Sequence, residues 1–415
     1  MNGNKVFGLI GSRLSHSRSP QIHAMLGCKG YALYELEEKD LYAFLHRDDI
    51  GMLNVTIPYK KTVLTMCDKL TKRAKAIGSV NTVVRCADGT LLGDNTDAGG
   101  FSAMAKRAGI SLKDKKILIF GSGGAQLAVR YVCLNEGSRS VVTVSRTGTD
   151  NYENLANHAD AELLVNATPV GTFPDDCKAV IDISLFPKCS GVLDLVYNPP
   201  RTVLFLQAKA LGIPCSCGLP MLVAQARAAQ ELFSSKSIGT DKDESILRKL
   251  FKEDKNIVLI GMPGCGKTTV GNVLARITGR RAIDTDTEAE RLAGMSVQDI
   301  FRKNGEKAFR EYEAKAIRSA SLQRGVIIMT GGGAVTSPQN LLPLRCSARV
   351  YHIERATDEL PVDGRPLSRS GSISELYAKR LPLYRLFRDT TVINDVSPDI
   401  TAKMIWRDFC ENSCD

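Results

Sequence analysis

The sequence lacks several features that would mark a membrane, secreted or zinc-bound protein. It contains no apolar run of about 18 residues, which argues against a membrane-spanning helix. Its first residues lead directly into an apolar, strand-like run and lack the regions of a signal peptide. Its twelve cysteines include no C-x-x-C pair. We therefore expect a cytoplasmic protein whose thiols are reduced rather than paired or bound to zinc.

Charge is not concentrated in any one part of the chain. The net charge of +10 is spread along 415 residues, without a basic tail or a stripe of aromatic and basic residues. This suits anionic small molecules as well as nucleic acid, and nothing favours the latter. We expect small-molecule substrates, no nucleic acid, no membrane and no obligate protein partner. The composition is that of a soluble globular protein, and the length predicts two or three domains.

The most specific stretch is Gly261–Thr268, which fits the phosphate-binding pattern G-x-x-x-x-G-K-[ST]. Asn256–Ile260 before it is typical of a buried strand, and Thr269–Ile277 after it of a helix. Glycines let backbone N–H groups turn toward phosphates, and the helix N-terminus adds positive potential. Lys267 supplies a charge, and the Thr268 hydroxyl can bind Mg²⁺.

A second glycine-rich turn lies earlier in the chain. A strand at residues 115–121 runs into Gly121–Ala125 and a helix, and the next strand, Ser140–Val144, ends in Ser145–Thr147. This is a dinucleotide-type βαβ unit, although Gln126 occupies the third glycine place. Arg146 stands where an NAD site carries an acid for the ribose 2′-OH. Arginine and hydroxyls suit a 2′-phosphate, so NADP is favoured over NAD.

Residues 1–100 alternate strand-like and helix-like runs, which predicts a βαβ sheet. Three stretches in this part carry more polar groups than a loop needs: Ser15–Pro20, Asn54–Lys60 and Gly93–Asp97. Further strands are expected at Leu163–Asn166, Val180–Ile183 and Gly191–Leu195, and a polar linker at Ser234–Asp243. Later polar or glycine-rich stretches are Asp284–Asp286, Gly305–Arg310 on a helix, Gly331–Gly333, Asp363–Pro366 and Arg380–Tyr384.

Residues 1–236 resemble shikimate dehydrogenase over their whole length. The motifs that carry this resemblance are HSRSP (16–20), NVTIPYK (54–60), SVNT (79–82), DNTD (94–97), GSGGA (121–125), SRT (145–147), NATPVG (166–171), DLVYNP (194–199) and GLPMLVAQA (218–226). Residues 255–408 resemble shikimate kinase. Here the motifs are the phosphate loop, DTD (284–286), GE..FR (305–310), GGGAVTSP (331–338), GRPL (364–367) and RLPLYR (380–385).

Together the resemblances imply an α/β protein that fuses two enzymes. The expected order is a substrate domain (1–98), a Rossmann-type NADP domain (99–236) whose last helix returns to the substrate domain, a linker (237–254), and a P-loop domain like nucleoside monophosphate kinases (255–415). The implied activities are NADPH-dependent reduction of 3-dehydroshikimate to shikimate and phosphorylation of shikimate by ATP and Mg²⁺.

The dehydrogenase resemblance assigns roles to individual residues. Lys60 matches the catalytic lysine and Asp97 its partner; an ammonium can stabilise the oxygen that gains charge and donate a proton to it. Substrate contacts are implied for Ser17, Ser19, Thr56, Lys60, Asn81, Asp97, Tyr197 and Gln225. NADP contacts are expected at Gly121, Gly123, Gly124, Ala125, Ser145, Arg146, Thr147, Thr168, Gly218 and Met221.

The kinase resemblance does the same for the second half. Asp286 matches the residue that meets the accepting hydroxyl, and Arg365 the lid arginine. Arg310 and Arg380 match arginines that clamp the substrate carboxylate. ATP contacts are implied for Gly261, Gly264, Cys265, Gly266, Lys267, Thr268, Thr269 and Arg365. Shikimate contacts are implied for Asp286, Arg310, Gly331, Gly332, Gly333 and Arg380, and metal contacts for Thr268 and Asp284.

Two alternatives stay open at this point. A regulatory protein could bind the metabolites without chemistry, but such a binder could lose Lys60, Lys267 or Asp286, and all three are present. The dehydrogenase half could instead act on quinate with NAD, against which Arg146 argues.

Overall fold

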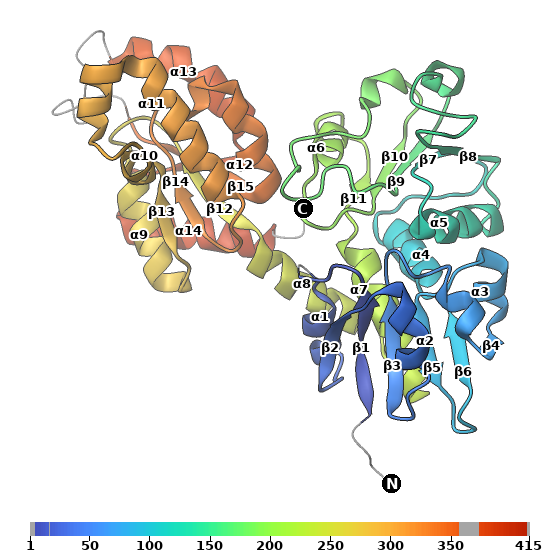
Figure 1. Ribbon diagram of the computed structural model, residues 1–415. Coiled ribbons are helices and arrows are strands. Elements are labelled where there is room, and N and C mark those ends of the chain that lie inside the picture. Colours follow the sequence, from blue (N-terminus) through green and yellow to red (C-terminus); the bar gives the residue numbers. More distant parts are fainter. Residues whose placement is uncertain (1–4, 16, 357–372, 413–415) are drawn as a thin grey trace. The chain divides into compact units, whose positions relative to one another are not determined.

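The computed structural model describes residues 5–15, 17–356 and 373–412 (Figure 1). The chain divides into two compact units. Unit 1 comprises Met1–Thr172, Lys178–Asn198 and Leu204–Leu247, and unit 2 comprises Phe173–Cys177, Pro199–Val203 and Arg248–Asp415. Unit 1 contains two sheets and unit 2 one.

The first sheet of unit 1 has six strands in the order β2-β1-β3-β5-β6-β4. β1 pairs in parallel with β2 and β3, whereas β5 is antiparallel to β3 and β6. The strands are β1 (Val6–Gly11), β2 (Tyr31–Glu35), β3 (Ile50–Val55), β4 (Lys69–Leu70), β5 (Thr82–Arg85) and β6 (Leu91–Asp94). Its helices are α1 (Ser19–Met25), α2 (Leu41–Leu45) and α3 (Lys72–Ile77).

The second sheet of unit 1 is wholly parallel, in the order β11-β10-β9-β7-β8. Its strands are β7 (Lys116–Phe120), β8 (Ser140–Val144), β9 (Leu163–Asn166), β10 (Gly191–Asp194) and β11 (Cys215–Ser216). The helices are α4 (Asp97–Arg107), α5 (Gly124–Asn135), α6 (Val203–Ala210) and α7 (Leu219–Ser234). The strand order reverses between β7 and β9, and open α/β sheets bind ligands at such a point.

Two helices link the sheets of unit 1. α4 leads from β6 of the first sheet to β7 of the second, and α7 follows β11 (Figure 1). The two helices pack closely, because a Cβ on Gly100 of α4 would lie 2.7 Å from the Met221 carbonyl oxygen of α7. The far end of α7 packs on the first sheet, where the rings of Phe233 and Phe7 are 4.9 Å apart.

The strand expected at Val180–Ile183 is absent, so that prediction was wrong. A 3₁₀ turn, Ile183–Leu185, begins there instead, and the Asp182 carboxylate caps it by accepting from Ser184 N. Ile181 and Ile183 are nonetheless buried in the core. The apolar pattern in this segment reflects burial of a loop, which periodicity in a short run does not distinguish from a strand.

Unit 2 contains one parallel sheet, ordered β13-β14-β12-β15-β16. Its strands are β12 (Asn256–Ile260), β13 (Ala282–Asp284), β14 (Ile327–Met329), β15 (Ala348–Glu354) and β16 (Thr390–Ile393). The helices are α9 (Lys267–Thr278), α10 (Thr285–Ala293), α11 (Val297–Ser321), α12 (Leu341–Ser347), α13 (Ile373–Phe387) and α14 (Pro398–Glu411). α8 (Asp241–Asp254) precedes β12 in the chain. Gly305 was expected within a helix, but its φ of 81° and ψ of 173° interrupt α11.

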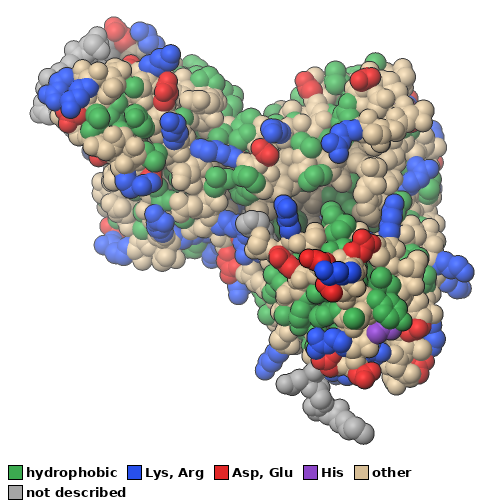
Figure 2. All heavy atoms as spheres, viewed as in Figure 1, with side chains coloured by type: hydrophobic (Ala, Val, Ile, Leu, Met, Phe, Trp, Pro, Cys, Tyr) green, Lys and Arg blue, Asp and Glu red, His purple; other side chains and the backbone are tan. Residues whose placement is uncertain are grey.

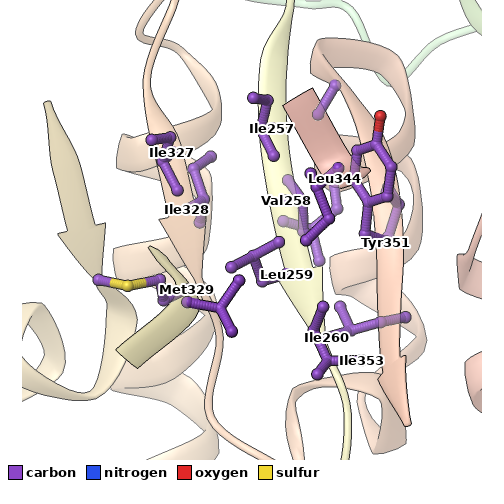
Figure 3. Close-up of a cluster of buried hydrophobic side chains, with 14 of the residues drawn as sticks. Ile257, Val258, Leu259, Ile260, Ile327, Ile328, Met329, Leu344, Tyr351 and Ile353 are labelled. Carbon is purple, nitrogen blue, oxygen red and sulfur yellow. The ribbon is translucent and has the colours of Figure 1, made fainter. Parts of the chain in front are cut away.

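The core of unit 2 forms around β12, the middle strand. Ile257, Val258, Leu259 and Ile260 are all fully buried and lie between side chains of β14 and β15, such as Ile328 (Figure 3). Burial on both faces of a parallel strand explains the continuous apolar run in the sequence. The strand therefore ends at a fixed place, and the glycine loop begins directly after it.

Within the described ranges, no helix combines the length and apolar character needed to cross a membrane. On the face shown in Figure 2, basic side chains are scattered among acidic, apolar and uncharged ones.

Leu259→Ala is expected to lower the free energy of unfolding of unit 2 by about 3 kcal/mol, because the surrounding core only partly fills the resulting cavity. Trp406, the chain's single tryptophan, lies on α14 of the same unit, so its fluorescence during urea unfolding reports on unit 2. Leu193→Ala makes the same truncation in unit 1 and is the matched control, which should leave the Trp406 transition in place. If Leu259→Ala unfolded at the same urea concentration as the wild type, as followed by Trp406 fluorescence, the result would contradict the packing described around Leu259.

Candidate active sites

A cavity of about 650 Å³ lies in unit 1 between elements of its two sheets. All eight predicted dehydrogenase substrate residues line it: Ser17, Ser19, Thr56, Lys60, Asn81, Asp97, Tyr197 and Gln225. Ala125, Gly218 and Met221, predicted to contact NADP, also line it. Residues separated by up to 208 positions in the sequence, from Ser17 to Gln225, therefore share one cavity.

An ammonium and a carboxylate meet in this cavity. Lys60 Nζ lies 2.5 Å from Asp97 Oδ2, with the two side chains 13% and 8% exposed. The other carboxylate oxygen of Asp97 accepts a hydrogen bond from Asn81 Nδ2 at 2.8 Å. Because one oxygen binds Lys60 and the other Asn81, the carboxylate is fixed in orientation and holds the lysine at the cavity wall.

The polar segments around Asn81 and Asp97 hold each other in place. Asn81 Oδ1 accepts from Thr96 N at 2.7 Å, and Asn95 Nδ2 donates to the Ser79 hydroxyl and carbonyl oxygens at 2.9 and 3.0 Å. All five residues of this hydrogen-bond network (Ser79, Asn81, Asn95, Thr96 and Asp97) are buried. The two polar motifs seen in the sequence are thus one network, in which most buried polar groups bind each other; Asn95 Oδ1 is buried without a hydrogen-bond partner among the described residues.

An ion pair between half-exposed Arg73 and buried Asp94 supports this network from outside the cavity. Arg73 Nη2 lies 2.5 Å from Asp94 Oδ2, and Asp94 Oδ1 accepts from Thr71 Oγ1 at 2.6 Å and Asn95 N at 2.7 Å. These hydrogen bonds and Arg73 hold the pKa of Asp94 below its usual range, against the opposing effect of burial. The ionised side chain of Asp94 anchors the start of the segment that ends in Asp97.

The loop from β1 to α1 forms another wall of the cavity. Leu14 N donates to Glu35 Oε1 at 2.6 Å, which ties this loop to the end of β2. Ser17 Oγ accepts from Ser19 N at 3.2 Å at the start of α1. The hydroxyls of Ser17 and Ser19 therefore lie together where the helix begins.

The dinucleotide-type turn follows β7. Gly121 has φ +112°, a conformation that favours glycine, and a Cβ there would lie 2.9 Å from the Ala167 carbonyl oxygen. The turn thus runs beside the end of β9, at the reversal of strand order. Gly123 directly precedes α5 and has no side chain to cap it, so backbone N–H groups at that helix end are available to an anion.

Residues predicted to select NADP lie beside this turn. Gly121 N donates to Val144 O at 2.8 Å, which places Ser145, Arg146 and Thr147 next to it in space. Arg146 and Thr147 are exposed and Ser145 is half-buried. An uncapped helix end beside an exposed arginine and two hydroxyls fits a phosphorylated dinucleotide.

Two further residues set the shape of this region. Gln126, in the third glycine place, is buried and donates to Thr143 Oγ1 of β8 at 2.8 Å. It therefore fastens α5 to the sheet instead of allowing the closer approach that glycine permits. Thr168 donates from its hydroxyl to Asn166 Oδ1 at 2.6 Å, which fixes the chain after β9.

A second cavity, of about 610 Å³, lies in unit 2. Its wall contains most of the predicted kinase residues: Gly264, Lys267, Thr268, Asp284, Asp286, Arg310, Gly331, Gly332, Gly333 and Arg380. Gly261, Cys265, Gly266 and Thr269 belong to the adjoining loop and helix start. Arg365 lies outside the described residues.

The lysine of the phosphate loop is held by that loop. Lys267 Nζ donates to the carbonyl oxygens of Gly261 and Met262, both at 2.9 Å. α9 begins at Lys267 without a side-chain cap. The positive charge and the free N–H groups of the helix end therefore point to the same region, the arrangement that binds phosphate groups.

Thr268 and Asp284 form the part of this cavity that suits a metal ion. Thr268 Oγ1 lies 3.2 Å from Asp284 Oδ2, while Asp284 Oδ1 caps α10 by accepting from Asp286 N at 3.0 Å. The cap fixes the carboxylate and leaves Oδ2 toward the hydroxyl. Mg²⁺ usually takes one or two protein oxygens together with substrate phosphates, so these two oxygen donors fit it.

Asp286 lies in an unusually acidic and buried place. Burial, and then the carboxylates of Glu313 and Asp284, raise its pKa to about 6, although Lys267 and Arg310 oppose the shift. Asp286 Oδ1 and Glu313 Oε1 are both buried without a hydrogen-bond partner within the described part of the chain. A Cβ on Gly331 would clash with Asp286 Oδ1 and lie 2.8 Å from Glu313 Oε1, so both oxygens border one small space.

Two arginines flank the glycine segment. Arg310 Nη1 donates to Glu313 Oε2 at 2.8 Å, and a Cβ on Gly333 would clash with the Arg310 guanidinium. Arg380 Nη1 donates to the Gly332 carbonyl oxygen at 3.1 Å. A side chain at 331 or 333 would displace a carboxylate or a guanidinium that approaches the backbone there.

Several wall residues were not found from the sequence. Glu313 is fully buried, although its spacing of three from Arg310 is typical of an exposed helical ion pair. Arg13 lines the unit 1 cavity but belongs to no motif. The other additions in unit 2 are Glu290, Ser296, Val297, Gln298, Phe301 and Leu376. Only three-dimensional proximity distinguishes these residues from ordinary surface or core positions.

Comparison with known families gives two matches along the chain. A family model described as shikimate dehydrogenase substrate binding domain matches residues 9–83. A model described as shikimate kinase matches residues 263–409. The first match contains Lys60 and Asn81, and the second contains most of the phosphate loop with Asp286 and Arg380.

Relatives of the first half are similar over their whole length. A shikimate dehydrogenase (NADP(+)) of Clostridium perfringens is 32% identical in an alignment of 267 residues, which covers 59% of this chain and 98% of the relative. The structure of the Thermus thermophilus shikimate 5-dehydrogenase in complex with NADP(H) and shikimate is 33% identical. It has a TM-score of 0.53 and covers 59% of this chain and 99% of its own. A quinate dehydrogenase of Corynebacterium glutamicum in complex with NAD is 27% identical with a TM-score of 0.53, covering 59% and 99%.

Asn81→Ala is expected to weaken the network around Asp97, because it leaves Thr96 N and Asp97 Oδ1 without partners. Each such buried group costs about 1–3 kcal/mol. Hydrogen exchange followed by mass spectrometry should show lower protection in peptides covering residues 79–105. Asn135→Ala is the matched control, since that exposed amide only donates to the Tyr131 carbonyl oxygen. Equal protection in both variants would contradict the network.

Proposed function

The chain belongs to the shikimate dehydrogenase family and carries a shikimate kinase domain after it, and from this premise we propose which residues perform its two reactions. The protein is a bifunctional enzyme of the shikimate pathway. Its first half reduces 3-dehydroshikimate to shikimate with NADPH, and its second half phosphorylates shikimate with ATP and Mg²⁺ to shikimate 3-phosphate.

The contact between Lys60 and Asp97 carries the assignment of the reduction site. NADPH supplies the hydride when it is bound beside Ala125, Gly218 and Met221, at the cavity wall nearest the dinucleotide-type turn. Hydride arrival at the ketone carbon leaves negative charge on its oxygen. Lys60 stabilises this charge and donates the proton, and Asp97 keeps the ammonium at that position.

The remaining polar residues of this cavity orient the substrate. Ser17 and Ser19 offer hydroxyls to the carboxylate, next to the start of α1. Thr56, Asn81, Tyr197 and Gln225 line the rest of the wall and provide donors and acceptors for the ring hydroxyls. Orientation of this kind brings the ketone to Lys60 and reduces the entropic part of the barrier.

The row of groups from Lys267 to Asp286 carries the assignment of the kinase site. Lys267 and the N–H groups at the start of α9 bind phosphate oxygens, and Thr268 with Asp284 holds Mg²⁺, which neutralises phosphate charge. Asp286 accepts the proton of the attacking hydroxyl. Arg310 and Arg380 bind the substrate carboxylate, and Gly331–Gly333 allow the substrate to approach the backbone. Arg365, outside the described residues, is proposed to close over the phosphates.

The domain boundaries stay predictions, with a substrate domain at 1–98, an NADP domain at 99–236, a linker at 237–254 and a kinase domain at 255–415. We also propose a cytoplasmic location, which agrees with the free thiols of all the described cysteines. The expectation that the enzyme needs no nucleic acid, membrane or obligate protein partner is likewise a proposal.

The alternatives are less well supported. A regulatory binder has no need of a lysine held 2.5 Å from a buried carboxylate, nor of an acid beside a phosphate loop with one oxygen buried and unpartnered among the described residues. Use of quinate with NAD is opposed by exposed Arg146 beside the dinucleotide-type turn, where a 2′-phosphate is expected.

A coupled assay tests both reactions in one solution. Given 3-dehydroshikimate, NADPH and Mg-ATP, the wild-type protein should oxidise NADPH and form ADP only after shikimate has been made. Lys60→Ala is expected to lower the rate of NADPH oxidation by about 10²- to 10⁴-fold, because it removes the proton donor, and to leave ADP formation from added shikimate unchanged. Lys267→Ala should have the reverse effect.

Each variant is the control for the other, because each must keep one full activity to show that it has folded. If the wild type formed ADP from added shikimate but never from 3-dehydroshikimate, the reduction assignment alone would be overturned. Loss of both activities in one folded variant would contradict the division of roles.

The pH dependence of the kinase reaction tests the place of Asp286. Its pKa of about 6 means that the carboxylate form, which accepts the proton, is lost as pH falls through about 6. We expect kcat/KM of the kinase reaction to fall in the same range. Of the two neighbouring carboxylates that raise the pKa of Asp286, Glu313 has the larger effect. Glu313→Gln removes it, so the fall in kcat/KM should move to lower pH.

Glu306→Gln is the matched control for this experiment. Glu306 also pairs with Arg310, with Oε1 2.9 Å from Nη2. It is not one of the groups that shift the pKa of Asp286. For Glu306→Gln, the fall in kcat/KM at low pH should match that of the wild type. An unmoved fall in Glu313→Gln would show that another group controls the profile.

A further inference from the structure

The cavity in unit 1 carries one charge that the reduction mechanism does not use. Its charged lining residues, within the described ranges, are Arg13, Lys60 and Asp97. Lys60 and Asp97 form an ion pair of 2.5 Å and neutralise each other. The cavity wall is therefore left with one net positive charge, on the Arg13 guanidinium.

Arg13 lies on the loop that also bears Ser15 and Ser17 and leads to Ser19 at the start of α1, and all of these residues line the cavity. Its side chain is exposed and has no hydrogen-bond or ion-pair partner within the described residues. The loop itself is fixed next to this residue, because Leu14 N donates to Glu35 Oε1 at 2.6 Å. An unpaired arginine on an anchored loop at a cavity wall can reach a ligand without losing another contact.

We propose that Arg13 is a substrate-binding residue of the dehydrogenase, which pairs with the substrate carboxylate held by Ser17 and Ser19. The inference rests on the proposed function, since it takes this cavity as the 3-dehydroshikimate site. The substrate carries one carboxylate, and the wall carries one uncompensated cation. The serine hydroxyls fix the orientation of the carboxylate but supply no charge, whereas the guanidinium supplies both charge and paired donors.

The pairing would also make the site selective. A neutral ester keeps the ring and hydroxyls of the substrate but loses the charge, so it forfeits the ion pair and leaves Arg13 solvated. Because the guanidinium is exposed, the attraction is screened by salt. A phosphate oxygen of the cofactor is the other anion that could reach this side chain, and the experiment separates the two.

The test uses the full-length enzyme in the oxidative direction, with shikimate and NADP⁺ and without ATP, so that only the dehydrogenase turns over. Arg13→Gln is expected to raise KM for shikimate about five- to tenfold and to leave kcat and KM for NADP⁺ nearly unchanged. Arg13→Lys should lie between. The wild-type preference for shikimate over its methyl ester should shrink in Arg13→Gln, and the wild-type KM should rise more steeply with salt.

Arg18→Gln is the matched control: Arg18 lies on the same loop but donates to Gln21 Oε1 at 2.9 Å and does not line the cavity. Kinase activity of each variant, measured with added shikimate, reports that the chain has folded. An unchanged KM for shikimate in Arg13→Gln would overturn the inference, and so would a rise in KM for NADP⁺ alone, which would assign Arg13 to the cofactor. Failure of the wild type to oxidise shikimate would overturn the proposed function instead.

Discussion

Both active sites depend on one geometric constraint, that the carboxyl ends of parallel strands meet at the same edge of a sheet. β7 ends at the turn that begins with Gly121, and β12 ends at the loop that begins with Gly261. Lys60 follows β3, whose parallel neighbour β1 leads into the loop of Ser17. Each strand is held in register by hydrogen bonds along its length, so the first residues beyond it are placed with the accuracy of the sheet. Only the few loop residues between a strand end and the site are then placed without the hydrogen bonds of the sheet.

The two sites treat charge in opposite ways. In unit 1 both oxygens of the central carboxylate, Asp97, have partners, so Lys60 is held in place at the cavity wall by an opposite charge. In unit 2 burial, and then the carboxylates of Glu313 and Asp284, raise the pKa of Asp286, which also has an oxygen with no partner among the described residues. A proton donor benefits from the first arrangement and a proton acceptor from the second. The same physical quantity, the degree of charge compensation, is set differently for two chemistries.

The sequence predicted the parts of this structure that follow from local rules. Phosphate-loop spacing, the strand before it and the polar motifs around Asn81 and Asp97 were visible because backbone geometry and ligand chemistry restrict those residues. The strand predicted at 180–183 was wrong because buried loops and buried strands share an apolar pattern. Glu313 was not identified from the sequence for a related reason. A helical Arg–Glu pair has the same sequence spacing whether it is solvated or buried, and only the surrounding fold determines its burial. Arg13 shows the same limit, since no motif marks an arginine that becomes functional through its neighbours.

The glycine segment after β14 has a consequence for how this enzyme can change. Each of its three glycines faces a different neighbour: the carboxylates at Gly331, the Pro263 ring at Gly332 and the Arg310 guanidinium at Gly333. Any single substitution that adds a carbon therefore collides with a group that has its own task. A lineage that shifts toward a different acceptor can therefore alter this segment only if the facing group moves or is replaced. This coupling restricts the mutational routes by which the kinase half can acquire a new specificity.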